Sequence, residues 1–200
     1  MKPLADTPTY ESIARRLSSR AALWLGAGWG FAEALLFFIV PDVWLGLVAL
    51  YAPRRMLITL VAIVLGAIAG ATVLFLVSLV LGDGFSGVIV ALPGITDADL
   101  AQARAELAEQ GPVAFLNGIL QGLPVKVYIH AAALDGIELT QVVFFTLLNR
   151  VERLLVFGVV MALLGWLGRP VLRRWPRGCL ALYGVTWIIF YAGFLLGRGG

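Results

Sequence analysis

Residues 56–81 read MLITLVAIVLGAIAGATVLFLVSLVL and contain no charged side chain. At about 1.5 Å per residue, a helix of this length is longer than the hydrocarbon core of a bilayer, which is about 30 Å thick. The whole chain agrees with this stretch, since 60% of its residues are hydrophobic, 14% are charged and its mean hydropathy is +0.94. A soluble domain carries about 25% charged residues. The sequence therefore predicts an integral membrane protein.

The basic residues lie at the ends of the apolar runs, where membrane topology places them. The net charge of +3 therefore does not indicate a nucleic-acid-binding protein. Cys179 is the only cysteine and His130 the only histidine, so we expect no disulfide, metal site or cofactor. A cytoplasmic N-terminus puts most arginines inside and the acidic segment 82–111 outside. We expect a multi-pass protein of the cell membrane, which is the inner membrane if the source is bacterial.

The apolar stretch 21–53 is too long for one span, too short for two, and broken at Pro41. The stretch 112–135 repeats this pattern with a break at Pro124. We interpret both as re-entrant helical hairpins, whose non-helical backbone must be covered by protein or water. The predicted fold class is an all-α integral membrane protein, built as an inverted repeat of re-entrant hairpin plus transmembrane helix with an extra C-terminal transmembrane helix.

The chain is expected to form a single membrane domain, 1–200. Its predicted parts are an interfacial amphipathic helix 1–20, hairpin 21–53, transmembrane helix 56–81, polar connector 82–111 with a short helix 96–110, hairpin 112–135, and transmembrane helices 138–168 and 180–197. Gly66 and Gly70 have the spacing of close helix packing. Thr96 and Asp99 predict a capping box.

Charged groups at membrane depth cost about 2.5–3.5 kcal/mol each, so they usually face a cavity and one another. Lys126, Arg150 and Arg153 could hold a phosphate, the arginines as planar forks and the lysine as a point charge. Glu33 and Asp42 are the candidates for proton exchange or gating. The alternative is that these charges form buried ion pairs that only fix the helix register.

Three stretches also carry a family resemblance. They are FAEALLFFIVPDVWLGLVALYAPRR (31–55), LQGLPVKVYIHAAALDG (120–136) and FFTLLNRVERLLVFGVV (144–160). In this order they resemble the DedA/VTT superfamily of SNARE-associated Golgi proteins, most closely its YqaA-like branch. The resemblance implies two facing re-entrant hairpins and lipid translocation, with proton coupling in some members. It points to the same five charged residues.

Three residues form a second tier of candidates. Gln121 stands where the better-known branch of the superfamily has an arginine, and Asn149 replaces the glycine that usually precedes Arg150. Glu152 lies between the two arginines.

The leading hypothesis is a flippase- or scramblase-like transporter of a phosphate-bearing lipid, such as a polyprenyl phosphate or a phospholipid, with protons as a coupling ion to be tested. Its partners would be membrane lipids, and it would not be an enzyme. The alternative is a non-transporting membrane scaffold or small-ion transporter. A remote alternative is an intramembrane serine protease, because Gly84–Gly87 reads GFSG and His130 could serve Ser86 as a base.

Overall fold

The computed structural model describes residues 7–117 and 123–198, and every regular element in these residues is a helix. Two continuous helical stretches are long and apolar enough to cross a membrane, Pro53–Val90 and Pro176–Gly197. The first consists of η1 (Pro53–Arg55), α4 (Met56–Leu81), η2 (Gly82–Phe85) and α5 (Ser86–Val90). The predictions of an all-helical protein and of membrane-length helices at 56–81 and 180–197 are therefore confirmed, whereas the predicted span 138–168 is not among the described stretches that are apolar enough.

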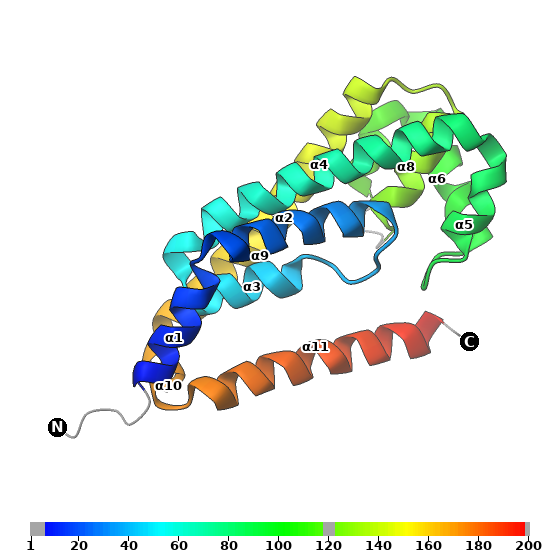
Figure 1. The fold of residues 1–200 in the computed structure, drawn as a ribbon. Helices are drawn as coiled ribbons and strands as arrows, with labels where there is room; N and C mark the ends of the chain where they lie inside the picture. Colours follow the sequence, from blue (N-terminus) through cyan, green and yellow to red (C-terminus); the bar gives the residue numbers. More distant parts are fainter. Residues whose placement is uncertain (1–6, 118–122, 199–200) are drawn as a thin grey trace.

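The first half of the chain forms a helical hairpin beside α4 (Figure 1). It contains α1 (Thr7–Leu17), α2 (Arg20–Leu35) and α3 (Asp42–Tyr51). The indole of Trp44 donates to the carbonyl of Ala22, so the chain of α3 returns along α2. At the end of α3, Tyr51 accepts a hydrogen bond on its carbonyl from the Tyr10 hydroxyl of α1. The hairpin therefore starts and finishes at the α1 end of the molecule.

The second half of the chain is also built of helices. Its elements are α6 (Asp97–Gln110), η3 (Gly111–Leu116), α8 (Val125–Leu134), α9 (Leu139–Leu167), α10 (Arg169–Arg174) and α11 (Pro176–Arg198). After α8, Asp135 accepts hydrogen bonds from Arg104 of α6, at the end where α5 lies. Residues 125–133 of α8 are all buried. A helix this short and apolar is therefore enclosed by protein.

Glycine allows α2 and α4 to pack backbone against backbone. A Cβ atom at Gly66 would overlap the carbonyl oxygen of Ala27, and one at Gly70 would overlap that of Phe31. On α2, a Cβ atom at Gly30 would overlap the carbonyl oxygen of Ile63. The close packing predicted for the Gly66 and Gly70 spacing is thus confirmed, and no larger residue fits without separating the helices.

The last helix, α11, lies along the side of the bundle (Figure 1). Its membrane-length window has none of its residues buried. The hydroxyl of Tyr183 donates to the carbonyl of Val43, and the hydroxyl of Tyr191 accepts from the backbone N–H of Val40. Both bonds attach α11 to the start of α3, so an otherwise exposed helix borders the tip of the first hairpin.

Some element boundaries differ from the sequence expectations. The break in the first hairpin covers residues 36–41, because α2 already ends at Leu35; proline fixes its own φ and disfavours helix in the residue before it. The last helix begins at Pro176, which suits a first turn. The capping box of Thr96 with Asp99 is confirmed. Gln121 lies outside the described residues.

Candidate functional site

A pocket of about 270 Å³ lies where the α2–α3 break meets the start of α8. The ammonium of Lys126, at the start of α8, donates to the carbonyl of Phe37 in the α2–α3 break at 2.8 Å. The pocket wall comes from α2 and the α2–α3 break, from the start of α8 and the residues before it, from α9, from the segment after α5 and from α11. Its residues are Glu33, Phe38, Val40, Leu92, Pro93, Ile95, Leu123, Pro124, Val125, Lys126, Asn149, Arg150, Arg153, Phe190, Tyr191 and Phe194.

Two ion pairs connect α9 to the first hairpin. Arg150 Nη2 lies 2.6 Å from Glu33 Oε2, and both side chains are buried, with 3% and 8% of their surface exposed. This contact is short but does not have the direction of a hydrogen bond, since Glu33 Oε2 lacks a donor among the described residues. Arg153 Nη2 donates to Asp42 Oδ2 at 3.0 Å. The two arginines are three residues apart and share one face of α9.

The charges at this site do not balance. Lys126, Arg150 and Arg153 are three cations, whereas Glu33 and Asp42 are two carboxylates, which leaves one positive charge in excess. Lys126 is 4% exposed, and its ammonium bonds to a carbonyl, not to a carboxylate. In addition, Arg150 Nε and Arg153 Nε are buried donors with no acceptor in the described part of the chain. Unsatisfied buried donors next to excess positive charge suit an anionic ligand.

The structure therefore brings the five principal sequence-predicted residues together. Glu33, Lys126, Arg150 and Arg153 line the pocket, and Asp42 is held at its edge by Arg153. Glu33 is paired with Arg150, and its role in proton exchange or gating stays a prediction.

Of the second-tier residues that the structure describes, one lines the pocket and the other does not. Asn149 is buried, lines the pocket and donates its amide to the carbonyl of Phe115. Glu152 is exposed on the opposite side of α9 and does not line the pocket. Pro41 precedes the first residue of α3, and Pro124 precedes α8 and forms part of the pocket wall. Both prolines thus lie at helix starts, where the missing N–H costs nothing.

Sequence reasoning missed the contribution of α11. Phe190, Tyr191 and Phe194 form the apolar side of the pocket, and the ring of Tyr191 meets that of Phe38 edge to face at 5.8 Å. Their spacing of three and four residues places them on one helix face. An aromatic stripe on an apolar helix was the available signal, but the sequence does not show what the stripe faces.

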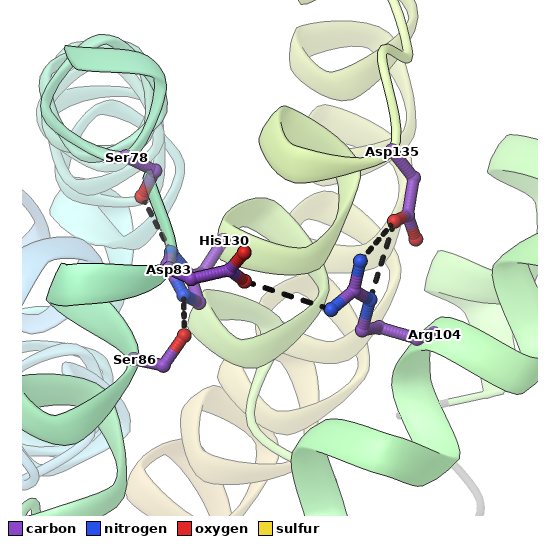
Figure 2. Close-up of polar contacts among 6 residues, drawn as sticks. All are labelled: Ser78, Asp83, Ser86, Arg104, His130 and Asp135. Carbon is purple, nitrogen blue, oxygen red and sulfur yellow. Dashed lines mark hydrogen bonds and ion pairs between the residues drawn. The ribbon is translucent and has the colours of Figure 1, made fainter. Parts of the chain in front are cut away.

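A second polar cluster lies at the far end of α4 (Figure 2). Ser86 Oγ is 2.9 Å from His130 Nε2, and His130 Nδ1 is 2.9 Å from Ser78 Oγ. Next to it, Arg104 contacts Asp83 at 3.7 Å and Asp135 at 2.9 Å. The hydrogen bond that the serine hypothesis requires between Ser86 and His130 is thus present.

No family model, curated protein or solved structure matches the chain. The likeness to the DedA/VTT superfamily therefore stays a prediction from the three quoted stretches. The geometry of the pocket is the main basis for assigning a function.

Proposed function

We propose that the protein moves a phosphate-bearing lipid across the membrane and that the pocket between the hairpin tips holds its headgroup. The main support for this proposal is the excess positive charge of Lys126, which lies at a site that already contains two ion pairs. A phosphate oxygen would accept from the ammonium, and the unpaired Nε donors of Arg150 and Arg153 offer two further N–H groups.

The form of the pocket wall supports a lipid over a free anion. Its charged residues come from the hairpins and α9, whereas α11 contributes only aromatic rings. The outer side of α11 is exposed and apolar, as expected of a surface that contacts acyl chains. A ligand with an ionic head and a hydrocarbon tail would satisfy both sides of this wall.

Placement in the bilayer follows from charge and from helix length. With α1, α10 and their arginines at the cytoplasmic face, the connector with Asp83, Asp97 and Asp99 faces outward. The two hairpins then enter from opposite faces as re-entrant elements of an inverted repeat, and their tips meet near the midplane. The burial of α8 supports this placement, since protein must cover such a segment.

The test is transbilayer movement of a headgroup-labelled anionic phospholipid in proteoliposomes. Lys126→Gln removes the unpaired cation without breaking either ion pair, so we expect at least a tenfold slower movement in a folded variant. Arg169→Gln removes an equal charge from an exposed site on α10 and should move lipid at the wild-type rate. Equal rates for Lys126→Gln and wild type would refute the proposal.

The competing function is a scaffold or small-ion transporter, favoured by the fact that four of the five charges are already paired. Glu33→Gln distinguishes it. A scaffold predicts a lower yield of folded protein with no flux to lose, and an ion transporter predicts an altered ion flux while labelled lipid does not move.

A further inference from the structure

The Ser86 cluster lies outside the pocket and has a geometry of its own (Figure 2). Three elements build it: α4 provides Ser78, the start of α5 provides Ser86, and α8 provides His130. His130 and Ser78 are fully buried, whereas Ser86 is half-buried. One hydroxyl of the chain of hydrogen bonds is therefore accessible from outside.

Both nitrogens of the imidazole have a hydroxyl partner, Ser78 at Nδ1 and Ser86 at Nε2. Ser78 lies within α4, where a serine hydroxyl can donate to the preceding turn and accept with its oxygen. In the tautomer that a base at this position requires, Nδ1–H donates to Ser78, and Nε2 accepts the hydroxyl proton of Ser86 across the 2.9 Å contact. The ring of Phe85 meets the imidazole edge to face at 5.8 Å and limits its rotation. A nucleophile, a base and a group that orients the base are thus in line.

A buried histidine that merely satisfies its hydrogen bonds would need no access from outside, but here access is open. Gly84 and Gly87 flank Ser86, and nothing lies within 4 Å of a Cβ atom built on either glycine. Apolar side chains next to the serine are exposed, including Val80, Leu81 and Val88. An acyl chain in the adjacent leaflet could therefore lie against them.

We propose that Ser86 is a nucleophile activated by His130 and that it accepts acyl groups from esters at the membrane surface. Ser86 Oγ attacks the carbonyl carbon while its proton passes to Nε2 of His130. The ester C–O bond then breaks, and the departing alkoxide takes that proton to leave as an alcohol. Water, giving its proton to the same nitrogen, attacks the acyl-serine, and the proton returns to Ser86 as the fatty acid leaves.

The substrate class follows from the group that orients the imidazole. Within residues 7–117 and 123–198 no carboxylate bonds to His130, because Asp83 and Asp135 contact Arg104 instead. Loss of the triad carboxylate costs a serine protease about 10⁴ in turnover. Esters, whose leaving group departs more easily than an amine, are therefore the substrates, and peptide bonds are not. This activity is independent of lipid transport.

The test is the labelling of purified protein with a fluorophosphonate, with the modified residue located by peptide mass spectrometry. We expect label on Ser86, none at this position in Ser86→Ala, and a rate at least tenfold lower in His130→Gln, since general base catalysis contributes about 10²–10⁴. The rate of p-nitrophenyl butyrate hydrolysis should also be at least tenfold lower in His130→Gln. Ser18→Ala, which removes a half-buried serine that bonds to the carbonyl of Ala14, should change nothing.

Ser78 is a positioning residue, so Ser78→Ala should slow labelling and move its pH profile, and Ser78→Thr should restore both. If His130→Gln fails to fold, the pH dependence of the labelling rate in the wild-type protein tests the proposal instead. A labelling rate that rises and reaches a plateau as the base loses its proton supports the proposal. The proposal would be overturned by a labelling rate that rises in proportion to hydroxide concentration without a plateau. It would also be overturned if Ser86 stays unlabelled in folded protein, or if His130→Gln slows labelling less than tenfold.

Discussion

At the scale of single residues, the pairing of Glu33 with Arg150 explains how a carboxylate and a guanidinium remain buried inside an apolar bundle. Each charge alone would be expensive, and the 2.6 Å contact offsets that cost. Arg150 Nε has no acceptor among the described residues, and the Arg150 side chain lines the pocket. The pair is therefore both a structural element and a part of the proposed site.

Glu33→Leu should lower the free energy of unfolding by about 3–5 kcal/mol, because it leaves Arg150 buried without a counter-charge. The double variant Glu33→Leu/Arg150→Met removes both charges and should recover most of that loss. SDS-induced unfolding in mixed micelles measures both. A double variant no more stable than the single one would show that the pair is not what holds α2 to α9.

Glu106, in α6, gives a prediction about pH. Burial alone would raise the pKa of this carboxyl, but hydrogen bonds from Tyr128, Gln102 and Asn117 outweigh burial and lower the pKa. A carboxyl with a lowered folded-state pKa contributes stability above its unfolded pKa of about 4.3, and this contribution is lost as pH falls through the folded value.

The wild-type melting temperature should therefore fall on acidification below about pH 5, and Glu106→Gln should show a smaller fall. Glu109→Gln, an exposed change on the same helix, should follow the wild type. An equal acid response in Glu106→Gln would contradict the role given to these hydrogen bonds.

At the scale of elements, the contact of α2 with α4 depends on glycine. Gly66→Ala places a methyl group against the carbonyl of Ala27 and should destabilise the protein by about 1–3 kcal/mol, as overpacking does. Gly28→Ala is the matched control, since it lies on α2 with nothing within 4 Å of its Cβ position. Thermal unfolding in detergent would separate them, and equal melting temperatures would argue against backbone contact.

Some of these elements could be predicted from the sequence, and others could not. The uncharged run 56–81 was enough to predict a membrane-length helix, and Thr96 with Asp99 was enough to predict a helix start. Signals of this kind come from residues that are close together in the sequence. The bond between Asp42 and Arg153 joins residues 111 apart, so their meeting could be predicted only from the cost of burying each charge. The position of α11 over the pocket had no local signal.

At the scale of the whole molecule, the α2–α3 break and the start of α8 are in contact, and the polar pocket lies at this contact. Side chains far apart in sequence thereby surround one small volume. The inverted repeat and its placement in the bilayer stay predictions, consistent with the buried α8 and the arginine-rich α1–α10 end.

The central claim is that this pocket binds the phosphate of a lipid. Native mass spectrometry of the purified protein, given a long-chain phosphorylated lipid or the matching alcohol, measures this directly. The account predicts that the phosphorylated lipid is retained, that the alcohol is not, and that Lys126→Gln loses the bound lipid while Arg169→Gln keeps it. Equal retention of the two lipids, or equal retention by both variants, would contradict it.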